Sequence, residues 1–109
     1  MYETLIQRAQ VIDGTGSEGY SADIAIKDGK IARITEKKIK GKKTIDATGH
    51  VVSPGFIDLH AHGQNIGDYR MQAMQGVTTM LELESGLLPI ADWYEAQGKK
   101  TLPINYGAG

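Results

Sequence analysis

Residues 51–63 read VVSPGFIDLHAHG, and the run FIDLHAH at residues 56–62 decides the fold. We predict a β-strand over this run, because side chains that alternate along a strand point to opposite faces. One face then carries Phe56, Asp58, His60 and His62, and the other carries Ile57, Leu59 and Ala61. Such a strand fits an α/β barrel, in which the apolar face packs on helices and the polar row points into the mouth.

The two histidines, His60 and His62, lie at the carboxyl end of this predicted strand, where α/β barrels carry their chemistry. Two neutral imidazoles on one face can share a divalent cation, and zinc is the expected metal. Asp58, on the same face, could accept a hydrogen bond or lie beside the metal. The alternative is a pair of surface histidines on a loop, because the H-x-H pattern alone is common.

Downstream of this run the sequence alternates between helical and extended patterns. The predicted elements are a helix over residues 66–75, a strand over residues 77–83, a helix over residues 89–97 and a strand over residues 101–106. Gly76 follows the first helix where a helix would end, and Pro89 stands where the second would begin. This order predicts parallel strands joined by crossover helices in residues 53–109.

Upstream of the run the sequence reads as short strands. Residues 23–27 and 30–34 are extended runs separated by Asp28-Gly29, which predicts a tight hairpin because both central turn residues need positive φ. Further short runs with β character occupy residues 5–6, 11–12, 44–46 and 51–52. We predict a small antiparallel β unit over residues 1–52.

The composition excludes several classes of protein. The chain has 109 residues, a formal net charge of −1 and no cysteine. The near-neutral charge gives no reason to expect a nucleic acid or an anionic membrane as a partner, and without cysteine there is no disulfide, thiolate zinc site or thiol nucleophile. The first ten residues lack the pattern of a signal peptide, and no apolar run approaches the length of a membrane span. We therefore expect a soluble, cytoplasmic protein.

The number of predicted strands is small for a parallel sheet. Three parallel strands with two helices leave part of each sheet face uncovered, whereas parallel sheets are normally buried on both faces. A closed eight-stranded α/β barrel takes about 250 residues. We expect the chain to be the truncated N-terminal piece of such a barrel, or to complete its core by self-association as a homo-oligomer.

The segment VVSPGFIDLHAHG resembles the signature of the amidohydrolase superfamily, P-G-x-x-D-x-H-x-H on the first strand of its barrel. The glycines of residues 14–16, the Asp28-Gly29 hairpin and the IDATG run of residues 45–49 resemble its N-terminal β-sandwich, and GVTT at residues 76–79 resembles the start of its second barrel strand. The resemblance implies a metal-dependent hydrolase with a (β/α)₈ barrel, in which His60 and His62 are metal ligands.

Within that superfamily, the stretches GVTT, LPIADWY and NYGAG resemble the N-acyl-D-amino-acid deacylase branch most. The implied substrate is a small-molecule amide, such as an N-acyl-D-amino acid, and the bond hydrolysed is a C–N bond other than a peptide bond. A cyclic amide, as in hydantoinase- or dihydroorotase-like relatives, is the alternative substrate. A non-catalytic assembly or metal-binding module is the alternative outside the enzymes.

The chain departs from this branch in its second strand, because members often carry a metal-ligating cysteine there and this chain has none. Glu82 and Glu84 stand near that position, on the same parity as Thr78 and Met80, and one of them could supply a carboxylate ligand. The alternative is that both are solvated acids at the end of a strand. No catalytic residue is assigned within the chain, so we expect residues 1–109 alone to be inactive.

Two further motifs predict no binding site. Residues 14–19, GTGSEG, match the dinucleotide fingerprint, but an extended pattern follows them where that fingerprint requires a helix, so we assign no cofactor-binding residue. The basic run at residues 37–43 lacks an aromatic side chain for base stacking, and we interpret it as a solvated loop.

Overall fold

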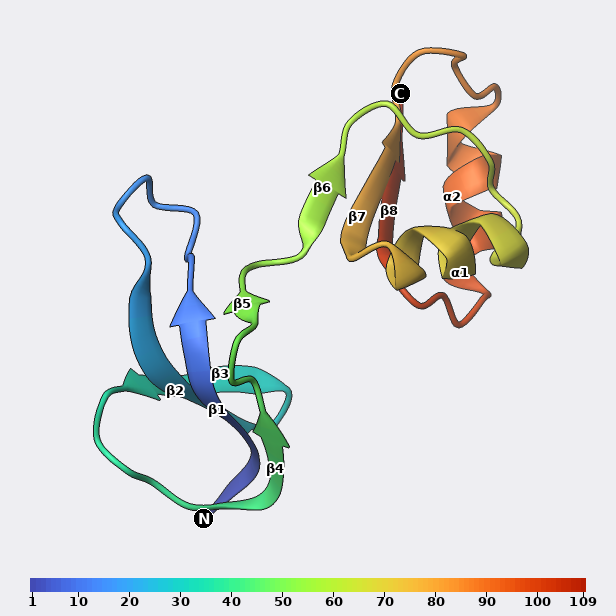
Figure 1. Ribbon diagram of the computed structural model, residues 1–109. Coiled ribbons are helices and arrows are strands. Elements are labelled where there is room, and N and C mark those ends of the chain that lie inside the picture. The colour runs from blue at the N-terminus through green and yellow to red at the C-terminus, as the bar shows by residue number, and fades with distance from the viewer. The chain divides into compact units, whose positions relative to one another are not determined.

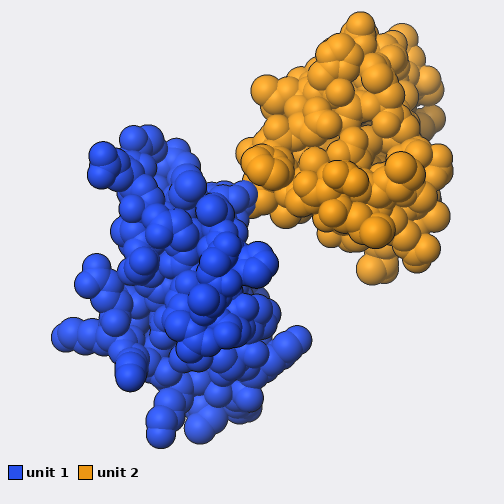
Figure 2. All heavy atoms as spheres, in the orientation of Figure 1, with its two compact units in different colours: residues 1–54 blue, residues 55–109 orange.

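The computed structural model describes residues 1–109, which divide into an N-terminal unit, residues 1–54, and a C-terminal unit, residues 55–109 (Figure 2). None of the helices is both long enough and apolar enough to cross a membrane.

The N-terminal unit is a single five-stranded sheet (Figure 1). Its strands are β1 (Tyr2–Val11), β2 (Tyr20–Lys27), β3 (Lys30–Thr35), β4 (Gly41–Asp46) and β5 (Val51–Val52). The order across the sheet is β3-β2-β1-β4, and β5 also pairs with β1. Alanines and branched residues of β1 and β2 form its core with one alanine that follows β4: Ala9, Val11, Ala22, Ile24 and Ala47.

The direction of the strands confirms one prediction and corrects another. The β2–β3 pair is antiparallel, and Asp28 and Gly29 between them have φ of 52° and 70°, as the hairpin prediction requires. The prediction of a wholly antiparallel unit is wrong, because β4 and β5 both run parallel to β1. The chain leaves β3 at one edge and reaches β4 beyond β1, so this connection is a crossover, for which the sequence carries no short turn signal.

The C-terminal unit alternates strands and helices around a parallel sheet (Figure 1). Its elements are β6 (Phe56–Asp58), α1 (Ile66–Met74), β7 (Val77–Glu82), α2 (Ile90–Gly98) and β8 (Asn105–Ala108). The sheet order is β6-β7-β8, and both pairs are parallel, which confirms the predicted β-α-β-α-β pattern. Side chains from the loops, α1 and β7 fill its core: Ala61, Tyr69, Val77, Met80 and Ile104.

Several boundaries differ from those predicted. Strand β6 ends at Asp58, so the prediction of a strand through His62 is wrong, and β8 begins at Asn105 rather than at residue 101. Of the predicted apolar face of the first strand, Ala61 is buried within this unit, whereas Ile57 and Leu59 are 63% and 61% exposed. Helix α1 begins where the sequence predicts, after an Asn65 cap that exchanges hydrogen bonds with Asp68.

Candidate metal centre

Two loops meet at one edge of the parallel sheet. Strands β6 and β7 are paired in parallel, with Asp58 opposite Met80, so their carboxyl ends lie at the same edge. Residues 59–65, here called the histidine loop, follow β6, and residues 83–89, here called the glutamate loop, follow β7. The candidate metal centre is built from these two loops.

The histidine loop is fixed by backbone hydrogen bonds. A carboxylate oxygen of Asp58 accepts the backbone N–H of His60 at 3.0 Å, which turns the chain away from the strand direction. Ala61, which is 2% exposed, donates its N–H to the carbonyl oxygen of Leu81 at 3.1 Å. His60 and His62 therefore flank an anchored, buried residue in a loop, which is the physical reason that the predicted strand is too long.

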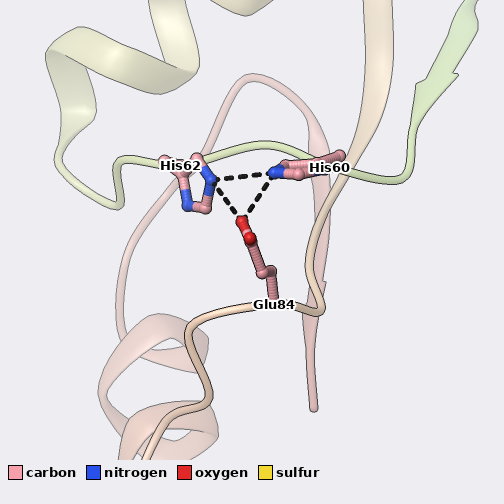
Figure 3. Close-up of side chains that lie close together, drawn as sticks. All are labelled: His60, His62 and Glu84. Carbon is pink, nitrogen blue, oxygen red and sulfur yellow. Dashed lines mark hydrogen bonds and ion pairs between the residues drawn. The ribbon is translucent and has the colours of Figure 1, made fainter.

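The side chains of His60, His62 and Glu84 converge at this edge (Figure 3). The two Nε2 atoms lie 3.1 Å apart, and their rings meet nearly at right angles, at 83°. One carboxylate oxygen of Glu84, Oε2, lies 2.6 Å from Nε2 of His60 and 3.1 Å from Nε2 of His62. All three side chains are at least half exposed, so solvent and ions reach the cluster.

Glu82 is the buried acid of the site, 4% exposed, and it contacts the ring nitrogen of His62 that does not face the donor cluster. Its Oε2 is 2.9 Å from Nδ1 of His62, and its Oε1 accepts the backbone N–H groups of Glu84 at 3.3 Å and Ser85 at 3.1 Å. The backbone N–H of Ser85 above all, and then His62 and the N–H of Glu84, hold the pKa of Glu82 below its ordinary value against the opposing effect of burial. The hydrogen bond and charge of Glu82, with a smaller contribution from Glu84, raise the pKa of His62.

The donor set fits a divalent cation. Each residue of the cluster offers one ligand atom, and the three atoms lie within 4.8 Å of one another. In tetrahedral coordination with ligand bonds of about 2.0–2.1 Å, two ligand atoms are about 3.3 Å apart, close to the 3.1 Å between the imidazole nitrogens. Two imidazoles and a carboxylate are also the ligand types that zinc and similar metals take from proteins.

The sequence-predicted site residues take different places in this geometry. Glu84 joins His60 and His62 in the donor cluster, whereas Asp58 binds a backbone N–H and Glu82 contacts the far nitrogen of His62.

Sequence reasoning missed the contact of Gln64, whose Oε1 accepts the indole N–H of Trp93 at 2.6 Å and ties the histidine loop to α2. No short-range pattern signals a contact between residues so far apart in the sequence. It also missed Ser85, whose backbone N–H binds Glu82, although the ELES run at residues 82–85 could have suggested a carboxylate that caps its own loop.

Comparison with known proteins gives a consistent family. The family model described as "Amidohydrolase family" matches residues 43–103. An allantoinase from Escherichia coli is 38% identical over 98 residues, a match that covers 81% of this chain and 21% of the allantoinase. An allantoinase from Salmonella choleraesuis is 37% identical over the same shares of the two chains. The chain thus spans about a fifth of the length of these curated relatives.

Three solved enzyme structures share the fold of this chain. The L-hydantoinase of Arthrobacter aurescens superposes with a TM-score of 0.81 at 25% identity, covering 99% of this chain and 27% of the hydantoinase. The N-acyl-D-glutamate deacylase of Bordetella bronchiseptica, solved with zinc and a phosphonate inhibitor, gives 0.80 at 26% identity, covering 98% and 29%. A D-aminoacylase gives 0.82 at 25% identity, covering 99% and 29%.

Proposed function

The chain belongs to the amidohydrolase family, and we propose that it supplies the first metal ligands of a metal-dependent hydrolase that cleaves a C–N bond other than a peptide bond. The observation that carries this proposal is the convergence of His60, His62 and Glu84 at the carboxyl edge of a parallel sheet. Enzymes with parallel β/α sheets place their chemistry at this edge.

In this proposal His60 and His62 hold the cation through Nε2, and Glu84 adds a carboxylate oxygen. Zinc is the proposed metal, which is also the metal bound in the structurally similar N-acyl-D-glutamate deacylase. Such a cation would make water more acidic and would polarise the oxygen of a carbonyl group. The chain's own residues position the donors: Asp58 fixes the backbone at His60, and Ala61 anchors the loop to β7.

For the substrate we propose a small-molecule amide, with an N-acyl-D-amino acid first. The structural likeness to a D-aminoacylase and an N-acyl-D-glutamate deacylase supports this choice. A cyclic amide is the second candidate, and the 38% identity to an allantoinase, with the likeness to a hydantoinase, favours it specifically. The two candidates share the C–N hydrolysis and differ in whether the amide lies in a ring.

We also propose that residues 53–109 begin a (β/α)₈ barrel and that residues 1–52 are part of a β-sandwich. Exposed apolar side chains support both, because each would be covered by further elements of such a fold. In the C-terminal unit these are Phe56, Ile57, Leu59 and Leu83. In the N-terminal unit Ile31 and Ile34 are exposed, and they line an apolar hollow of about 290 Å³. Self-association through these faces and a cytoplasmic location stay predictions.

Metal titration of the 109-residue protein tests the proposed site. We expect zinc affinity, measured by competition with a chromophoric chelator, to fall at least about 100-fold in His60→Ala and in His62→Ala, because each removes one of three donors. His50→Ala is the matched control, since His50 lies in the N-terminal unit and outside the donor cluster. Equal zinc affinity in the three variants and in the unsubstituted protein would refute the proposed site.

A substrate panel separates the two substrate classes. It should be run on the full-length protein that carries this chain, with N-acyl-D-amino acids against cyclic amides of the hydantoin type. Faster turnover of the N-acyl-D-amino acids supports the first candidate, and faster turnover of the cyclic amides replaces it with the second. The same assay on residues 1–109 alone should show no turnover, and measurable turnover there would contradict our expectation that other segments complete the site.

A further inference from the structure

Glu82 is a buried carboxylate whose contacts reach both loops of the candidate metal centre. It is 4% exposed, and a carboxylate buried this deeply needs hydrogen-bond donors for its oxygens. Its Oε2 lies 2.9 Å from Nδ1 of His62, and its Oε1 accepts two backbone N–H groups from the glutamate loop. We propose that Glu82 is a positioning residue and not a metal ligand: it fixes the ring of His62 and the backbone of Glu84 with one side chain.

The first half of this role concerns the tautomer of His62. A carboxylate can only accept hydrogen bonds, so the hydrogen bond of 2.9 Å to Glu82 favours the neutral imidazole with its proton on Nδ1. Nε2 then keeps its lone pair, which is the form that binds a metal. The Glu84 carboxylate, 3.1 Å from Nε2, favours a proton on Nε2 instead, and a cation between Nε2 and Glu84 would remove that competition. The hydroxyl of Ser85 also approaches Nδ1, at 3.4 Å, but a hydroxyl can donate or accept and therefore does not decide the tautomer.

The second half concerns the glutamate loop. The backbone N–H of Glu84 and that of Ser85 both point to Oε1 of Glu82, at 3.3 and 3.1 Å. The chain at Glu84 is thereby held against the same carboxylate that orients His62. In this proposal the two carboxylate oxygens of Glu82 bring the Glu84 carboxylate to 3.1 Å from Nε2 of His62, because Oε2 holds the imidazole ring and Oε1 holds the backbone of Glu84.

This inference rests on the proposed function, because a positioned donor set matters only where a metal binds. The informative variant is Glu82→Gln, which keeps the size of the side chain and an oxygen for the backbone N–H groups. Its amide nitrogen can only donate, so it would make Nδ1 of His62 the acceptor and move the proton to Nε2. We expect the tautomer of His62 to switch and zinc affinity to fall about 10–100-fold, the usual effect of losing a hydrogen-bond partner of a ligating histidine.

The matched control is Glu95→Gln, which removes the same charge from the same unit. Glu95 lies on α2, and its side chain is 70% exposed and paired only with Lys99. We expect this variant to keep the zinc affinity and the His62 tautomer of the parent protein. Histidine ¹H–¹⁵N correlation spectra of the metal-free protein read the tautomer without any activity measurement, and the same spectra of the unsubstituted chain serve if Glu82→Gln does not fold.

The inference stands if His62 of the unsubstituted chain carries its proton on Nδ1 and Glu82→Gln weakens zinc binding at least about tenfold relative to Glu95→Gln. It is overturned if the proton is on Nε2, or if a folded Glu82→Gln binds zinc within about twofold of the control. Loss of zinc binding in His60→Ala and His62→Ala with no effect of Glu82→Gln would refute the role of Glu82 alone. Unchanged zinc binding in both histidine variants would instead refute the proposed function.

Discussion

Gly63 follows His62 directly, and its replacement by alanine tests how the histidine loop joins helix α1. Gly63 has φ of +96°, a conformation that costs an alanine about 1–2 kcal/mol. A Cβ at Gly63 would lie 2.5 Å from Oδ2 of Asp68, the carboxylate that completes the helix cap with Asn65. Displacing that carboxylate should cost about 1 kcal/mol more, the usual value of a helix cap.

The expected loss for Gly63→Ala is therefore about 2–3 kcal/mol in the free energy of unfolding of the C-terminal unit. Gly86→Ala is the matched control, because Gly86 also has positive φ, +69°, and has no atom within 4 Å of an added Cβ. That variant should cost only the conformational part, about 1–2 kcal/mol. Urea unfolding followed by tryptophan fluorescence measures both, since the only tryptophan, Trp93, lies in this unit.

The two costs of Gly63→Ala can be separated. In an Asp68→Ala background the displaced carboxylate is absent, and only the Cβ of residue 68, at 3.0 Å, stays close to the added Cβ. The additional cost of Gly63→Ala should therefore fall toward that of Gly86→Ala. Equal losses for Gly63→Ala and Gly86→Ala in the unsubstituted background, within about 0.3 kcal/mol, would refute the argument from the cap. If Gly63→Ala leaves the free energy of unfolding unchanged, the argument from the positive φ of Gly63 is refuted as well.

Three further perturbations follow from single contacts. Leu5→Ala should destabilise the N-terminal unit by about 2–5 kcal/mol in urea unfolding followed by circular dichroism, because its side chain is 1% exposed; a loss under about 1 kcal/mol would contradict the packing. The Thr48 hydroxyl, above all, holds the pKa of Asp46 below its ordinary value, so ionised Asp46 stabilises this unit above about pH 4 and the gain is lost as the pH falls further. Asp46→Asn should make unfolding less dependent on pH below about pH 4, and an unchanged dependence would count against this contact. Gln64→Ala removes the acceptor of the Trp93 indole and should shift tryptophan emission and cost about 1 kcal/mol, whereas identical spectra would show that the bond is not formed.

The order of elements in the C-terminal unit could be predicted because local signals and packing agree there. Gly76 has φ of +86° and follows Gln75, the residue that caps the end of α1, and Pro89 precedes the first residue of α2. Both helices therefore end or begin where the residue types require. Buried Val77 and Met80 on β7 give the sequence its apolar strand pattern. These are short-range determinants, and the sequence displays them directly.

Strand direction in the N-terminal unit could not be predicted from the same kind of signal. The hairpin at Asp28-Gly29 fixes its own two strands, but nothing comparable fixes β4. Its parallel pairing with β1, Ile6 opposite Ile45, is a long-range contact reached through a crossover. A short run with β character such as residues 44–46 is compatible with either direction, so the direction is decided only when the strand pairs with β1.

The candidate metal centre depends on both short-range and long-range contacts. The sequence indicates His60 and His62 correctly although they lie in a loop and not in the predicted strand, because both conformations place the two side chains on the same side. Alternation along a strand brings residues i and i+2 to one face, and the Asp58 turn also leaves His60 and His62 on one side of buried Ala61. Ala61 is held by Leu81 of the neighbouring strand, so the positions of both histidines depend on β7 as much as on β6. The partner acid could not be chosen from the sequence, because Glu82 and Glu84 share one parity. Burial distinguishes them: the acid at the strand end is enclosed and binds N–H groups, and the one two residues later reaches solvent and the imidazoles.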